Sequence, residues 1–176
     1  ALSSAVARRR DRRVPLNFAF RDLRVTTLDR ETGHDKVLLD GVVGDFRAGK
    51  VTAIMGPSGS GKTVLFDTVI GRAPSEFVVS GDLKANGSGD IRMLRSSIGF
   101  VPQDDILFKE LTVLENAECM SALRLPPDFT TDDRRELIAS VLGALKIDHV
   151  QHVKIGDDEQ RGVSGGQRKR TNIAVE

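Results

Sequence analysis

The chain has 176 residues, of which 39% are hydrophobic and 29% are charged, and its formal net charge at pH 7 is +1. These values exclude a disordered chain and fit one ordinary globular domain with a hydrophobic core. The sequence contains no apolar run of the roughly 18 residues that a membrane span requires, and no signal-peptide core. The single cysteine, Cys119, excludes an internal disulfide and is typical of a reducing, cytosolic location. Because the chain starts with Ala1 rather than Met, we expect it to be a piece of a longer polypeptide.

The N-terminal residues are strongly basic. Residues 8–13 contain five arginines and one acidic residue, Asp11. We expect residues 1–15 to be a solvated basic linker, as charge runs usually are. Contact with anionic lipid head groups, or with nucleic acid, is the alternative. No aromatic platform or amphipathic helix accompanies the run, so the linker is favoured and no nucleic-acid partner is expected.

Strand patterns come first along the chain. Alternating apolar and polar residues predict a strand over 17–25 and a second over 37–46, joined by a polar loop over 26–36. The short apolar run 51–55 is stopped by Gly56. Such a run is typical of a buried strand in a parallel sheet.

A helix is expected next, over 62–70, with Gly71 ending it. A further strand is predicted over 77–85, followed by a turn at Asn86-Gly87. A last short strand is predicted over 98–101.

The second half of the chain is predicted to be helical. Thr112 with Glu115 forms a capping box that starts a helix through about Leu123. A second amphipathic helix is predicted over 131–145, capped by Thr130 or Thr131. A loop over 148–162 then leads to a basic helix from about Gly165 to the end.

Residues 56–63 match the pattern G-x-x-x-x-G-K-[ST] between a predicted strand and a predicted helix. Glycines allow backbone N–H groups to turn toward an anion, and the helix N-terminus adds partial positive charge. Lysine can reach the β- and γ-phosphates of a nucleotide, and the threonine hydroxyl can bind Mg²⁺. A glycine-rich turn that merely holds a lysine is the alternative. We expect phosphate contacts from Gly56, Pro57, Ser58, Gly59, Ser60, Gly61, Lys62 and Thr63.

A second anion-binding pattern opens the last predicted helix, where residues 163–167 read Val-Ser-Gly-Gly-Gln. Alone, it is a helix cap with a flexible turn. After a phosphate-binding loop it closely resembles the signature sequence of ABC ATPases. Gln103, in the sequence Phe-Val-Pro-Gln-Asp-Asp, looks like the Q-loop glutamine of that family. The stretches 99–105 and 161–170 are similar to the G (white/brown) subfamily of half-transporters.

The resemblance runs from about Phe18 to Glu176 and implies an α/β fold of the P-loop NTPase class. The expected ABC-type cassette has a mixed or parallel core sheet, an antiparallel β subdomain and a helical signature subdomain over about 104–176. Residues 16–176 would be the N-terminal portion of the ATP-binding domain. Walker B and the glutamate that activates water would follow Glu176, so we expect no catalytic residue in this chain and no ATPase activity from it alone.

The resemblance also implies ligands, partners and a location. ATP and Mg²⁺ are the expected ligands, and Thr63 and Gln103 are expected to complete the metal shell. Two cassettes, identical or different, pair head to tail, so that each nucleotide also meets the partner's signature. A membrane domain of the same polypeptide would use ATP hydrolysis to move a hydrophobic or lipid-like substrate, with the cassette on the cytoplasmic face. The signature residues expected to contact the partner's nucleotide are Val163, Ser164, Gly165, Gly166 and Gln167.

One residue departs from the family pattern. Thr27 stands where an adenine-stacking aromatic is expected, and the nearest aromatic, Phe20, fits the core, so we expect weak base selectivity. Two other functions share these motifs. One is a soluble ABC ATPase of the DNA-repair or translation type, and the other is a nucleotide-binding regulatory module without turnover.

Overall fold

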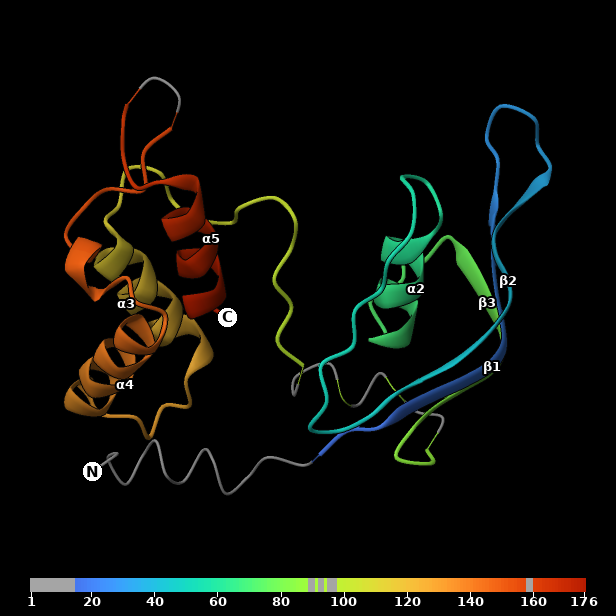
Figure 1. Cartoon of the computed structure of the whole chain (residues 1–176), viewed down its shortest axis with the longest axis horizontal. Helices are drawn as coiled ribbons and strands as arrows, with labels where there is room; N and C mark the ends of the chain where they lie inside the picture. Colours follow the sequence, from blue (N-terminus) through green and yellow to red (C-terminus); the bar gives the residue numbers. More distant parts are fainter. Residues whose placement is uncertain (1–14, 89–90, 92–93, 95–97, 158–159) are drawn as a thin grey trace. The chain divides into compact units, whose positions relative to one another are not determined.

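The computed structural model describes residues 15–88, 91, 94, 98–157 and 160–176 (Figure 1). These residues form two compact units, which fall within Val14–Ile98 and Gly99–Glu176. Apart from Pro15, the expected basic linker over residues 1–15 lies outside the described residues.

The first unit, the sheet unit, contains a three-stranded antiparallel sheet with the strand order β2-β1-β3. Its strands are β1 (Phe18–Leu28), β2 (Asp35–Phe46) and β3 (Phe77–Ala85). The strands predicted over 17–25, 37–46 and 77–85 are therefore confirmed, although the first loop is shorter than expected because β1 continues to Leu28. The predicted turn is confirmed as well, since Asn86 and Gly87 have φ angles of 49° and 83°.

The core of the sheet unit lies where β1 packs against α2 (Lys62–Val69), which appears beside the sheet in Figure 1. The rings of Phe20 and Phe46 meet edge to face, with centroids 5.5 Å apart. Gly44 makes room for this pair, because a Cβ atom there would lie 2.7 Å from the Phe20 ring. Phe20 is 3% exposed, so the expectation that it belongs to the core is confirmed.

Two predicted strands, 51–55 and 98–101, are wrong for this structure. Both stretches are irregular, and Val51 and Met55 are 101% and 87% exposed. The apolar composition predicted burial, but a strand also needs a neighbour to pair its N–H and C=O groups. Within the described ranges no strand pairs with either stretch, so the sheet seen here is wholly antiparallel and the expected parallel core sheet is not formed.

The second unit, the helical unit, contains α3 (Val113–Arg124), α4 (Thr131–Ala144), the 3₁₀ turn Asp148–Val150 and α5 (Gly165–Ala174). The three predicted helices are confirmed. Each begins with a capping box, in which the cap side chain and the third helical residue bond each other's backbone N–H groups. For α4 the structure selects Thr130, rather than Thr131, as the cap.

A continuous apolar core joins the three helices and the loop before α5. Leu142, Ile147 and Ile155 are at most 1% exposed. Asn116 is buried among them without an unpaired amide, because it bonds the backbone of Phe108 in both directions and also the carbonyl of Thr112. The other buried members of this core are Val113, Ala117, Ile138 and Val163.

Candidate phosphate-binding site

Glycine at position 61 is required where the phosphate-binding loop enters α2. Gly61 is the N-cap, with φ 84° and ψ 9°, a left-handed conformation that residues with a Cβ rarely adopt. A Cβ there would also lie 2.8 Å from Leu39 Cδ2 and 3.2 Å from the Leu38 carbonyl oxygen. The glycine therefore lets β2 hold the start of α2 at close range.

The N-terminus of α2 is open to an anion. No side chain caps it, and its first turn has no acidic residue, so the N–H groups of its first turn keep their partial positive charge. Lys62 Nζ folds back over the loop and donates to the Pro57 carbonyl oxygen at 2.6 Å and to Ser60 Oγ at 3.5 Å. Thr63 is exposed on the first turn. This arrangement can accept phosphate oxygens and a metal ion bound to them.

The signature residues form the capping box of α5. Gln167 N donates to Ser164 Oγ at 3.3 Å, and Ser164 N donates to Gln167 Oε1 at 2.9 Å. Both oxygens act as acceptors here, so the Ser164 O–H and the Gln167 NH₂ remain as donors. The first turn holds Gly165 and Gly166 and no acidic residue. The box thus leaves an anion-binding N-terminus whose side-chain donors are already oriented.

The loop before the signature packs tightly on itself. Val163 is buried in the helical core, and its N–H donates to the carbonyls of Lys154 and Ile155. Arg168 reaches back from α5 and donates to the Gly156 carbonyl at 2.9 Å. A Cβ atom at Gly162 would lie 2.1 Å from the Ile155 carbonyl oxygen. Backbone contacts therefore fix where the signature begins.

Gln103 is exposed and lies in the same unit as the signature. Its backbone carbonyl, like that of Pro102, accepts a hydrogen bond from Lys169 of α5. The structure thus brings Gln103 and the signature helix together, while the phosphate-binding loop belongs to the sheet unit.

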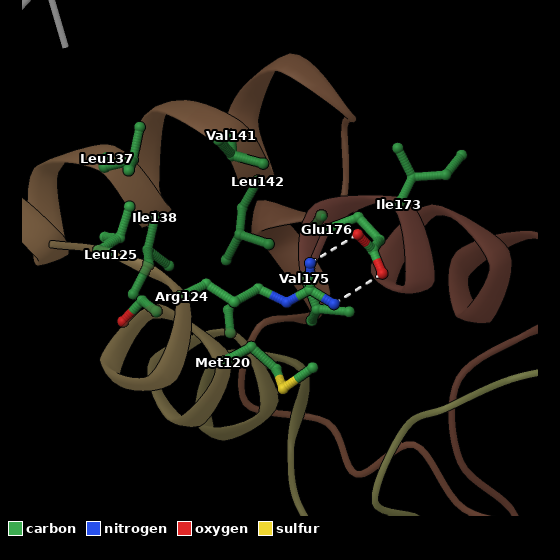
Figure 2. Close-up of a pocket in the computed structure, with 13 residues that line it drawn as sticks. Met120, Arg124, Leu125, Leu137, Ile138, Val141, Leu142, Ile173, Val175 and Glu176 are labelled. Carbon is green, nitrogen blue, oxygen red and sulfur yellow. Dashed lines mark hydrogen bonds and ion pairs between the residues drawn. The ribbon is translucent and has the colours of Figure 1, made fainter. Parts of the chain in front are cut away.

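Glu176 follows α5 and forms a two-pronged ion pair with Arg124 of α3, with N–O distances of 2.6 and 2.7 Å (Figure 2). A cavity of about 180 Å³ lies beside this pair and is lined mainly by apolar residues of α3, α4 and α5. The Glu176 carboxylate is only 12% exposed and is occupied by the arginine. These contacts fit a structural role for Glu176.

Thr27 lies near the end of β1, half-buried, and pairs across the sheet with Lys36 on β2 and with Phe77 on β3. Phe77 is itself half-buried. The register therefore places an aromatic residue directly opposite Thr27, which the sequence alone did not reveal because strand order cannot be read from one strand's pattern.

Neither a metal-binding cluster nor a membrane-spanning helix is found within the described ranges. No group of three or more His, Cys, Asp or Glu residues there could hold a metal ion, and no helix among those residues is long and apolar enough to cross a membrane. Partial burial in α2 raises the pKa of Asp67, which Arg72 partly offsets.

The sequence profile of the family described as ABC transporter matches residues 39–176. The chain belongs to the ABC transporter family. It therefore has the P-loop NTPase class of fold, and its relatives place it in the G subfamily. It is 39% identical over 94% of its length to "ABC transporter G family member 28" of Arabidopsis thaliana. It is 38% identical over 85% of its length to "Broad substrate specificity ATP-binding cassette transporter ABCG2" of Rattus norvegicus.

A bacterial relative matches as well. The chain is 42% identical over 81% of its length to "ABC transporter ATP-binding/permease protein Rv1747" of Mycobacterium tuberculosis. The three alignments cover only 14%, 22% and 16% of these relatives. The chain thus corresponds to a small part of each relative, and the family it belongs to is that of ATP-binding cassettes in transporters.

Proposed function

We propose that residues 16–176 form the N-terminal portion of the ATP-binding cassette of a transporter, with Gly56–Thr63 holding the phosphates of Mg-ATP. The observation that carries the proposal is the uncapped N-terminus of α2. There the partners of the Lys62 ammonium among the described residues are Pro57 and Ser60 of its own loop. A phosphate can replace the Pro57 carbonyl as the partner of Lys62, and this exchange gains a charge-assisted bond. Thr63 and Gln103 then complete the shell of the Mg²⁺ ion.

The signature serves a nucleotide held by a second cassette, identical or different. Residues 163–167 present oriented donors on an exposed helix N-terminus but no lysine comparable to Lys62. They suit the γ-phosphate of a nucleotide that another phosphate-binding loop already holds. The cassette pair lies on the cytoplasmic face and drives a membrane domain of the same polypeptide, which moves a hydrophobic or lipid-like substrate.

Turnover requires groups beyond those found here. Phosphoryl transfer to water needs a fixed metal ion and a residue that orients the attacking water. Thr63 and Gln103 would supply only part of a metal shell, and the Glu176 carboxylate is paired with Arg124. This chain alone therefore binds nucleotide without meaningful hydrolysis.

A titration with a fluorescent ATP analogue and Mg²⁺ tests the phosphate site. Lys62→Ala should weaken binding by about ten- to a hundredfold, because a bond to a charged group contributes roughly 1.5–3 kcal/mol. Lys50→Ala is the matched control, since Lys50 is exposed in the same unit outside the loop. Equal affinity of all three proteins would remove Lys62 from the site. Phosphate release by the wild-type chain that is lost in Lys62→Ala would contradict the expected lack of turnover.

A further inference from the structure

Side chains of α5, the signature helix, form hydrogen bonds with the segment Phe100–Asp105, which contains Gln103. Lys169 and Asn172 lie three residues apart, on the same side of α5, and Glu176 follows just after the end of the helix. All three bond the segment Phe100–Asp105.

Lys169 makes the shortest of these contacts. Its ammonium donates to the Pro102 carbonyl oxygen at 2.6 Å and to the Gln103 carbonyl oxygen at 3.0 Å. Two consecutive carbonyls held by one cation fix both the position and the direction of the peptide between them. Gln103 itself is exposed, so the contact with Lys169 acts on its backbone.

The other two residues hold the ends of the segment. Glu176 accepts from Phe100 N at 3.4 Å while Arg124 neutralises its charge. Asn172 is fully buried and donates to Asp105 Oδ1 at 3.4 Å, and Arg168 lies 4.0 Å from the other oxygen of that carboxylate. Segment Phe100–Asp105 and α5 therefore form one connected network of polar contacts.

We propose that Lys169 is a positioning residue that makes Gln103 and the signature move as one body. A nucleotide contact at the N-terminus of α5 then shifts the Gln103 backbone through the ammonium of Lys169, without a hinge between them. This inference rests on the proposed function, in which Gln103 completes the Mg²⁺ shell. Lys169 touches neither nucleotide nor metal and acts only through the two carbonyls.

A double-mutant cycle in the full-length polypeptide that contains this chain tests the proposal. The variants are Lys169→Met, Gln103→Ala and the double mutant. The readouts are kcat for ATP and the Mg²⁺ concentration that gives half-maximal binding of a fluorescent ATP analogue. Lys169→Met should raise that concentration by about five- to tenfold, because Gln103 loses its fixed backbone. The double mutant should match Gln103→Ala alone, since both changes act on the same contact.

Two further variants separate positioning from general stability. Lys169→Arg keeps a cation with several donors and should restore most of the Mg²⁺ response. Lys146→Met removes an exposed lysine from the same unit and should behave as the wild type. A lower kcat with unchanged Mg²⁺ dependence in Lys169→Met, or additive effects in the double mutant, would overturn the inference alone. An unchanged Mg²⁺ response in Gln103→Ala would overturn the role proposed for Gln103 and the inference with it.

Discussion

The helical unit buries its apolar side chains in a core of its own. In the sheet unit, by contrast, the apolar segment 51–55, which precedes the phosphate-binding loop, has side chains exposed to solvent. Leu142 and Ile147 are at most 1% exposed, while Val51 and Met55 are almost fully exposed. All four side chains are apolar. Apolar composition alone therefore does not decide burial, because the partner surface must also be present.

The difference follows from the range of the hydrogen bonds involved. A helix pairs its N–H groups within four residues and can take its end signals from adjacent side chains, as all three capping boxes show. A buried parallel strand pairs only with strands that are distant in sequence. The segment 51–55 finds no such strand among the described residues, so Val51 and Met55 stay exposed.

The largest expected effect comes from a pair of core and surface truncations. Leu142→Ala should lower the free energy of unfolding by about 2–5 kcal/mol, because it leaves a cavity in the helical core. Met55→Ala should change it by no more than about 0.5 kcal/mol. Urea unfolding followed by far-UV circular dichroism measures both, since the chain has neither Trp nor Tyr. A comparable loss in Met55→Ala would show that 51–55 is buried in solution and would break the comparison.

Two glycines of the phosphate-binding loop give the next effect. Gly59 and Gly61 both have positive φ angles, but only a Cβ at Gly61 meets other atoms. Alanine at either position should cost about 1–2 kcal/mol in backbone strain. At Gly61 the contact with Leu39 should add about 1 kcal/mol or more. Hydrogen exchange of the α2 amides should rise further in Gly61→Ala than in Gly59→Ala, and equal exchange would mean that β2 does not hold the start of α2.

The sequence predicted elements best where their determinants are local. The helices and the turn at Asn86-Gly87 each depend on a few adjacent residues, and the structure has a helix or turn at each place. The phosphate chemistry expected of Gly56–Thr63 stays a prediction. The failed strands 51–55 and 98–101 depend on distant partners. The contacts of Lys169 were missed for the same reason, since nothing in the pattern of α5 says which backbone segment lies against it.

Loss of a helix cap should lower the free energy of unfolding by less than loss of a core side chain. The capping boxes lie in the helical unit, so the effect is expected there. Thr112→Ala should cost about 0.5–2 kcal/mol, because the hydroxyl that accepts from Glu115 N is lost. Thr52→Ala is the matched control, since Thr52 lies in the exposed segment 51–55 of the sheet unit. It should be nearly neutral in the same urea assay. An equal loss in the two variants would mean that the cap contributes nothing of its own.

The smallest effects are two pH dependences of opposite sign. The backbone N–H of Thr112, and then its side chain, lowers the pKa of Glu115 below its usual 4.5. Partial burial instead raises the pKa of Asp67 above its usual 3.8. A lowered carboxylate pKa contributes stability above the unfolded value, and this is lost as the pH falls through the folded value. A raised one lowers stability as the pH rises through the folded value.

Charge-removing substitutions should therefore act in opposite directions in the two units. At pH 7, Glu115→Gln should lower the urea midpoint, because the ionised carboxylate accepts from the Thr112 backbone. Asp67→Asn should raise it, because partial burial disfavours the ionised carboxylate of Asp67. The Asp67 difference should shrink toward zero as the pH falls below the usual value of 3.8, where the wild-type group is neutral in both states. The Glu115 difference should shrink only as the pH falls through its lowered folded value. Urea midpoints measured at neutral and at acid pH on the same two variants check both signs. If Asp67→Asn also lowers the midpoint at pH 7, the attraction of Arg72 outweighs the burial of the Asp67 carboxylate. The ionised forms of Asp67 and Glu115 would then both stabilise the fold.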